Sequence, residues 1–262
     1  MTATLVRTRV DGGVAVVELD APPANCYSYD LMRQLDDAIL AARMDESVHV
    51  LVLRGAGERF FCAGADIAVL QSVTPEFKYY FCLHANETLQ RLEQTPKLVI
   101  AALNGHCVGG GLEVALACDF RLARRGAGKI GLPEVGLGVL PGTGGTQRLT
   151  RLVGRAKALE LMTLGRTFTF EEAQPLGLIT QILESDGFDA RVLEFARQFC
   201  PPHKASKAVG RIKRAVVSGG EVPLSEGLAL ERELQQQLFE SEDAREGLAA
   251  YVEKRPPRFL GR

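Results

Sequence analysis

Short apolar runs recur along the first two-thirds of the chain and predict β-strands. Four such segments are VAVVEL from Val14, VHVLVLRG from Val48, KLVIAAL from Lys97 and FRLAR from Phe120. In the second and third the apolar run is nearly continuous, which is typical of a strand buried on both faces of a parallel sheet. We therefore expect a sheet whose interior strands are covered on both sides.

Between these strands, apolar residues recur at helical spacing. Ser28 can cap a helix in which Leu31, Leu35, Ile39 and Ala42 form one apolar face. A short helix is predicted after the capping residue Asp66, and a longer one spans Pro75 to Gln94. One amphipathic helix is predicted from Gly145 to Gly165, and a further short helix extends from the Thr169–Glu172 capping box to Gly177. Strands that alternate with helices predict an α/β fold.

The strand pattern stops after Pro201 and Pro202. The residues beyond, ASKAVGRIKRAVVSGG and SEGLALERELQQQLFESEDAREGLAAYVEKR, have the apolar spacing of two or three helices. Two or three helices are too few to bury a core of their own. We therefore expect them to pack on the main body or on a neighbouring subunit. The chain is therefore divided into an α/β part, residues 1–198, and a helical part, residues 199–262.

Composition narrows the possible partners. The net charge of −1 over 262 residues gives no reason to expect nucleic acid or an anionic membrane as the main partner, and no apolar run is long enough to span a bilayer. The first residues do not read as a secretory signal. Six scattered cysteines, without close Cys/His spacing, predict reduced packing residues, no metal site and a cytoplasmic location: Cys26, Cys62, Cys82, Cys107, Cys118 and Cys200.

Glycine is concentrated in one region of the chain. Twelve of the 27 glycines lie between Gly105 and Gly145, and three of them directly precede a predicted helix in GHCVGGGLEVALACD. Such clustering indicates loops, or backbone that approaches a ligand closely. Two glycine-bearing segments, FFCAGADI and GHCVGGGLE, each follow a strand, and a pair of their backbone N–H groups could hold a carbonyl oxygen as it becomes an oxyanion.

Two carboxylates lie in these apolar, glycine-rich surroundings. Glu113 falls one turn into the helix after the three glycines, and Glu134 follows Pro133 in GLPEVGLGVLPGTGG. Two carboxyl groups in one desolvated site have pKa values that are pushed apart, so one can act as an acid and the other as a base. The alternative is that Glu134 pairs with an arginine such as Arg148 and that Glu113 lies on a helix surface.

Other motifs are weaker. The chain has no complete nucleotide-binding glycine motif and no G-x-S-x-G nucleophile motif. Tyr79, Tyr80 and Phe81 can line an acyl pocket or pack in the core. The basic segment containing Lys204, Lys207, Arg211, Lys213 and Arg214 can meet phosphate, but a solvated helix face is the default expectation.

These motifs together resemble the crotonase, or enoyl-CoA hydratase/isomerase, superfamily over nearly the whole chain. The resemblance is carried by FFCAGADI, NGHCVGGGLEVALACDFRLA, GLPEVGLGVLPGTGGTQRLTRLVG, LGRTFTFEEAQPLGLI and LFESEDAREGLAAYVEKRPPRF, in this order. It implies a ββα-spiral catalytic core followed by a helical trimerisation region, assembled as a homotrimer or a dimer of trimers. It also implies an acyl-CoA thioester substrate and no separate cofactor, because coenzyme A is part of the substrate.

The resemblance also assigns residues to the site. Ala65 and Gly110 would donate the two oxyanion-hole N–H groups, and Glu113 and Glu134 would be catalytic. The residues expected along the coenzyme A path are Ala24, Cys26, Ala63, Asp66 and Ile67, with Lys254 near the nucleotide end, where it can come from a neighbouring subunit. Cys26, Tyr27 and Ala68 depart from the family pattern, as does an apparent extra residue in RRGAGK, and these departures bear on the substrate.

With both glutamates present, the leading interpretation is syn addition of water across the 2,3 double bond of a trans-2-enoyl-CoA. One glutamate would activate water and the other would protonate the α-carbon. A second interpretation is another reaction of the superfamily, namely double-bond isomerisation, retro-aldol cleavage or hydration in an aromatic pathway. A third is a non-catalytic homologue that binds acyl-CoA or RNA, which would have no use for two desolvated acids.

Overall fold

The computed structural model describes residues 3–262, and its larger sheet has six strands in the order β1-β2-β3-β5-β7-β10. β1 is antiparallel to β2, and every other neighbouring pair is parallel. The strands span Val6–Asp11 (β1), Val14–Leu19 (β2), Val50–Gly55 (β3), Leu98–Leu103 (β5), Phe120–Arg124 (β7) and Gln181–Leu183 (β10). The four predicted strands are β2, β3, β5 and β7, in the middle of this sheet.

A second sheet contains four short strands in the order β4-β6-β8-β9. They span Phe60–Cys62 (β4), His106–Val108 (β6), Lys129–Gly131 (β8) and Thr167–Thr169 (β9). Each of β3, β5 and β7 is followed within a few residues by a strand of this second sheet, so the chain winds repeatedly from one sheet to the other. The resulting mixed α/β fold is the crotonase-like spiral that the motif resemblance implies.

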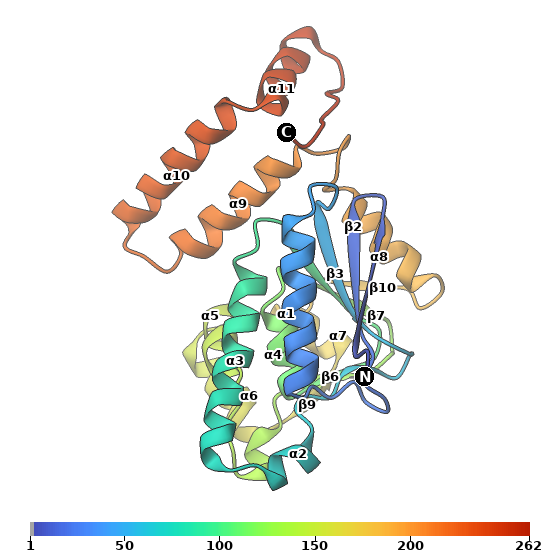
Figure 1. Ribbon diagram of the computed structural model, residues 1–262. Helices are drawn as coiled ribbons and strands as arrows, with labels where there is room; N and C mark the ends of the chain where they lie inside the picture. Colours follow the sequence, from blue (N-terminus) through green and yellow to red (C-terminus); the bar gives the residue numbers. More distant parts are fainter. Residues whose placement is uncertain (1–2) are drawn as a thin grey trace.

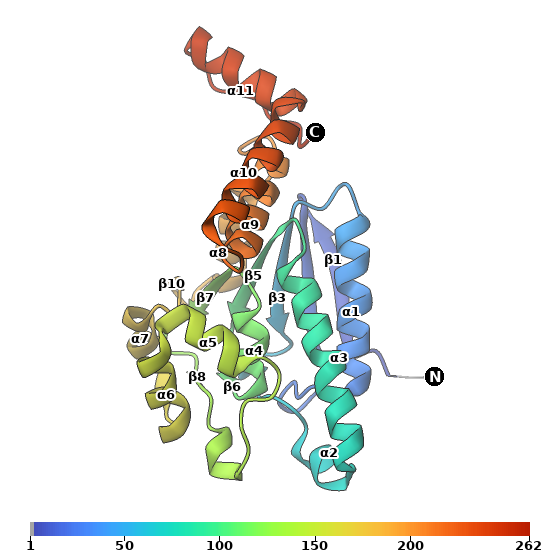
Figure 2. The same cartoon turned by 90° about the vertical axis from the view of Figure 1, so that its left-hand side faces the viewer.

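Helices cover both faces of the larger sheet (Figures 1 and 2). Helices α1 (Tyr29–Met44) and α3 (Pro75–Glu93) pack on one face, and α8 (Phe188–Arg197) packs on the other. Alternate strand residues therefore enter different cores: Leu53 faces α1 and α3, whereas Val52 faces α8. Burial on both faces explains why the central strands read as continuous apolar runs.

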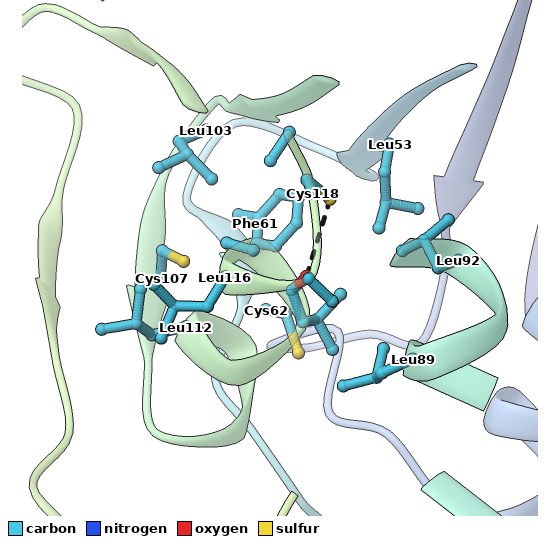
Figure 3. Close-up of a cluster of buried hydrophobic side chains, with 14 of the residues drawn as sticks. Leu53, Phe61, Cys62, Leu89, Leu92, Leu103, Cys107, Leu112, Leu116 and Cys118 are labelled. Carbon is cyan, nitrogen blue, oxygen red and sulfur yellow. Dashed lines mark hydrogen bonds between the residues drawn. The ribbon is translucent and has the colours of Figure 1, made fainter. Parts of the chain in front are cut away.

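The short helix α4 (Gly110–Leu116) lies entirely inside the protein, with all seven residues buried. Figure 3 shows Leu112 and Leu116 of this helix among Phe61, Cys62 and Cys107. Cys118 is also buried there, and its Sγ lies 3.6 Å from the carbonyl oxygen of Val114. All six cysteines are free thiols. Burial raises the pKa of Cys62 and of Cys118 to about 12, so these thiols stay protonated and pack as apolar groups.

The prediction of one helix from Gly145 to Gly165 is wrong. The structure has two helices, α5 (Gly145–Val153) and α6 (Arg155–Leu164), separated at Gly154. Gly154 has φ 80° and ψ 158°, a conformation that ends a helix and that glycine adopts without a Cβ penalty. The other helices of the core are α2 (Ile67–Ser72), α7 (Phe170–Ala173) and the 3-10 turns η1 (Glu134–Leu137) and η2 (Gln174–Leu176).

Three C-terminal helices form an arm that projects from the core: α9 (Ser206–Gly219), α10 (Leu224–Phe239) and α11 (Glu242–Glu253) (Figures 1 and 2). The expectation of a solvated basic face on α9 is wrong at one position. Lys213 is buried, and its Nζ lies 2.8 Å from Asp119 Oδ2 and 3.1 Å from the carbonyl oxygen of Lys97. This ion pair ties α9 to the large sheet.

The arm leaves much apolar surface uncovered. Its exposed apolar side chains include Val216, Leu224, Phe239, Tyr251 and Val252. A cavity of about 840 Å³ lies between α9 and the core, and neither Glu113 nor Glu134 lines it. No helix within residues 3–262 combines the length and the apolar character needed to cross a bilayer.

Candidate active site

Two segments that follow strands of the smaller sheet meet at the candidate site. One is the loop 63–66, after β4, and the other is 109–111, the N-cap and first residues of α4, after β6. They approach so closely that a Cβ on Gly64 would lie 2.9 Å from the backbone nitrogen of Gly110. Within residues 3–262, the N–H groups of Ala65 and Gly110 donate no backbone or side-chain hydrogen bond. The structure thus brings the two predicted oxyanion-hole residues together with their donors unused.

At each of the three consecutive glycines, an added Cβ would crowd a different neighbouring group. Gly109 has φ 57°, and a Cβ there would lie 3.1 Å from Glu134 Oε1. A Cβ on Gly110 would overlap the hydroxyl group of Tyr27, and a Cβ on Gly111 would overlap the carbonyl oxygen of Cys62. The glycines therefore let the start of α4 pack against three neighbouring segments at once.

Glu113 lies in the first turn of α4 and is only 2% exposed. Its Oε1 atom accepts hydrogen bonds from the backbone N–H groups of Thr143 and Gly145, each 2.7 Å long. Burial raises the pKa of Glu113, and these two donors oppose the rise because they stabilise the ionised carboxylate. The alternative that Glu113 lies on a helix surface is therefore wrong.

Glu134 reaches the same site from the turn η1, with its Oε1 beside Gly109. Its Oε2 atom is buried and has no hydrogen-bond partner within the described residues. Burial raises the pKa of Glu134 to about 7, and the negative charge of Glu113 adds to the rise. Arg148 pairs instead with Glu93, at 3.0 Å, so the alternative that Arg148 neutralises Glu134 is also wrong.

The residues predicted along the coenzyme A path lie mainly on two extended segments that are hydrogen-bonded to each other. The carbonyl oxygen of Ala24 accepts a 3.0 Å hydrogen bond from Ala63 N–H, and that of Gly64 accepts a 2.9 Å bond from Tyr27 N–H. Cys26 lies between these pairs and is half-buried, and burial raises the pKa of its thiol.

The predicted coenzyme A path continues into α2, which begins directly after the loop 63–66. Asp66 caps this helix by accepting hydrogen bonds from Ala68 and Val69, and Ile67 is half-exposed beside it. The structure therefore places all the predicted coenzyme A residues except Lys254 around one loop.

Lys254 lies elsewhere in the chain. It is exposed at the end of α11, on the arm, and Figure 1 shows α11 and α2 at opposite ends of the molecule. A single chain does not bring Lys254 to the site. Of the three aromatic residues considered for an acyl pocket, Tyr79 and Tyr80 are exposed, whereas Phe81 is buried beside Tyr27 with ring centroids 6.0 Å apart.

Sequence reasoning did not identify Thr143 and Gly145 as partners of Glu113. Both contribute backbone N–H groups, which any residue except proline can donate, so their side chains carry no signal of this role. The only signal was their place in the glycine-rich segment PGTGG.

The arrangement supports acid–base chemistry beside a polarised carbonyl group. One carboxyl group is held by two N–H donors, and the other has a pKa of about 7. The N–H groups of Ala65 and Gly110, which donate no hydrogen bond within residues 3–262, lie on the two segments that meet there. Within residues 3–262 there is no group of three or more His, Cys, Asp or Glu side chains arranged to hold a metal ion.

Comparison with known proteins shows which family this chain resembles. A family profile described as enoyl-CoA hydratase/isomerase matches residues 9–262. A probable enoyl-CoA hydratase of Bacillus subtilis is 39% identical over 96% of this chain and 97% of its own length, and a short-chain-enoyl-CoA hydratase of Clostridium acetobutylicum is 37% identical over 94% and 93%. A crystal structure described as "Enoyl-CoA hydrates from Geobacillus Kaustophilus HTA426" superposes with a TM-score of 0.96 at 43% identity, covering 100% of this chain and 98% of that one.

Proposed function

The chain belongs to the enoyl-CoA hydratase/isomerase family of the crotonase superfamily, and from this premise we propose that it is a hydro-lyase that adds water across the 2,3 double bond of a trans-2-enoyl-CoA. The product is a 3-hydroxyacyl-CoA. The single observation that carries this proposal is the convergence of Glu113 and Glu134 on the N-terminal end of α4. Relatives named as enoyl-CoA hydratases support it.

In the proposed mechanism the two carboxyl groups have different roles, and their different hydrogen bonding supports this division. Glu113, stabilised as an anion by two N–H donors, takes a proton from water as the water oxygen bonds to the β-carbon. The π electrons move onto the thioester oxygen, where the N–H groups of Ala65 and Gly110 hold the enolate. Glu134, neutral at the start, donates its proton to the α-carbon. The pair carries one proton before and after the step, so return of that proton from Glu113 to Glu134 completes the cycle.

This mechanism needs no metal ion and no separate cofactor, because coenzyme A enters as part of the substrate. The segment around Ala24, Cys26 and Ala63, with Asp66 and Ile67, would line the coenzyme A path. We also propose a homotrimer or a dimer of trimers, supported by the uncovered apolar surface of the arm. In such an assembly Lys254 of one subunit can reach the coenzyme A nucleotide bound by another. The six free thiols fit a reducing compartment, so the cytoplasm is the proposed location.

Isomerisation of an enoyl-CoA is the second candidate, since the family description includes it and one carboxyl group with a pKa near 7 can shuttle a proton between carbons. Hydration is favoured because isomerisation by a single carboxyl group gives Glu113 no role in the reaction.

The test is to follow the loss of enoyl-thioester absorbance with crotonyl-, octenoyl- and aromatic enoyl-CoA substrates. Hydration predicts formation of a 3-hydroxyacyl-CoA that carries oxygen from ¹⁸O-labelled water. Movement of the double bond without incorporation of that oxygen would replace the proposal with isomerisation.

A further inference from the structure

Tyr27 presents a polar group to the interior of the site. Its side chain is 3% exposed, and its hydroxyl lies 2.9 Å from Thr143 Oγ1, the one hydrogen-bond partner it has within residues 3–262. Its ring packs against Phe81 of α3. A phenylalanine would fill the same apolar space, so packing alone does not account for the hydroxyl.

The partner of Tyr27 is also a partner of Glu113. The backbone N–H of Thr143 donates a 2.7 Å hydrogen bond to Glu113 Oε1, and the side chain of Thr143 also lowers the pKa of Glu113. Thr143 itself is buried. The Tyr27 hydroxyl therefore holds the side chain of a residue whose backbone N–H holds Glu113.

The Tyr27 hydroxyl also contacts the backbone that would hold the substrate. It occupies the place that a Cβ on Gly110 would take. One side chain thus abuts the start of α4, which carries both the Gly110 N–H and Glu113. The phenol stays neutral because burial, and then the charge of Glu113, raise its pKa well above the ordinary value.

We propose that Tyr27 is a positioning residue for Glu113, acting through the hydroxyl of Thr143, and that it helps to keep Glu113 ionised as the base that activates water. This inference rests on the proposed function, since it assumes that Glu113 is the base. The other charged groups that act at this place are Lys78 of α3, which lowers the pKa of Glu113, and Glu134 of η1, whose pKa is raised by the charge of Glu113.

The test is Tyr27→Phe, which removes only the hydroxyl. We expect kcat for hydration to fall about 3- to 10-fold, with KM little changed. The acidic limb of the kcat–pH profile should move up by about half to one pH unit, because the hydrogen bond between Tyr27 and Thr143 is lost. Thr143→Val should produce a similar shift. The double variant should show no more than the larger single effect, because both changes remove the same hydrogen bond between Tyr27 and Thr143. Tyr29→Phe is the matched control, since Tyr29 is exposed at the start of α1.

A second readout does not depend on turnover. Carbon-13 NMR titration of the glutamate carboxyl groups, with Glu113→Gln used to assign the Glu113 signal, should show a higher pKa for Glu113 in Tyr27→Phe than in the unaltered protein. An unchanged pKa and pH profile would overturn the positioning role, and a lower melting temperature as the only change would reduce Tyr27 to a packing residue. If the unaltered protein hydrates no enoyl-CoA, the proposed function fails, while the NMR titration still decides whether Tyr27 acts on Glu113.

Discussion

The backbone N–H of Gly145 donates a 2.7 Å hydrogen bond to Oε1 of Glu113. This bond joins the first turn of α5 to the first turn of α4, so two helix starts meet at one carboxylate. Gly145 has no Cβ, and an added one would lie 3.0 Å from the same oxygen. The position of Glu113 is therefore set mainly by backbone donors, whereas Glu134 has one buried oxygen with no hydrogen-bond partner among residues 3–262.

Gly64 lies where the two segments of the proposed oxyanion hole approach each other, and its replacement should reduce activity. Gly64 has φ 95°, and an alanine Cβ would press on the nitrogen of Gly110, so Gly64→Ala should displace a donor and lower kcat/KM about 100-fold. Gly57→Ala is the control, because Gly57 has φ 72° and open space around it. Both variants should lose about 1–2 kcal/mol of stability from backbone strain. Equal kcat/KM values in the two variants would contradict the placement of the oxyanion hole.

The raised pKa of Glu134 predicts how stability depends on pH. A carboxyl group whose pKa rises from 4.5 unfolded to about 7 folded favours the folded state when it is protonated. That contribution is fully present below about 4.5 and is lost as pH rises through about 7. The free energy of unfolding of the unaltered protein should therefore fall relative to Glu134→Gln between these values and then level off. Urea denaturation across this range measures the difference. Glu194→Gln, at an exposed site on α8, controls for the substitution, and a flat difference for Glu134→Gln would refute the shift.

The buried Lys213–Asp119 ion pair should be required for the stability of the arm. Lys213→Met leaves Asp119 largely buried without its cation, which should cost about 3–5 kcal/mol in the free energy of unfolding. Lys207→Met, on an exposed part of the same helix, should change it by less than about 0.5 kcal/mol. The double variant Asp119→Asn/Lys213→Met should be more stable than Lys213→Met alone. A loss below about 1 kcal/mol in Lys213→Met would show that the pair does not anchor α9.

Lys254 tests the proposed assembly. If it contacts the coenzyme A nucleotide of a neighbouring subunit, Lys254→Ala should raise KM for acyl-CoA about 2- to 5-fold, as expected for an exposed charge pair. The KM for an acyl-pantetheine, which lacks the nucleotide, should not change. Lys207→Ala is the control for loss of a positive charge on the arm. Light scattering that finds a monomer, together with an unchanged KM, would exclude this contact.

The parts of the fold that follow from local chemistry could be predicted from the sequence. Ser28 does cap α1, and Thr169 with Glu172 does form the capping box of α7. The break at Gly154 was missed because a single glycine within a helical pattern does not by itself end a helix. The short strands β4, β6, β8 and β9 have three residues each, too few for a hydrophobic pattern to show.

The residues of the candidate site also differ in whether the sequence could predict them. Glu113 and Glu134 could be selected as candidates from the sequence, because a carboxylate in apolar, glycine-rich surroundings is unusual. Their partners were not, since Thr143 and Gly145 act on Glu113 through backbone N–H groups. The contact between Tyr27 and Thr143 joins residues 116 positions apart, and only the tertiary structure brings them together.

The central claim is that Glu113 and Glu134 act together on one enoyl-thioester. The most direct measurement is the rate of crotonyl-CoA hydration by Glu113→Gln, Glu134→Gln and the control Glu194→Gln, with binding of the substrate followed separately. Each of the first two variants should lose a factor of about 10² to 10⁴ in kcat while still binding the thioester, and Glu194→Gln should keep full activity. Undiminished turnover in either site variant would contradict a two-carboxylate mechanism.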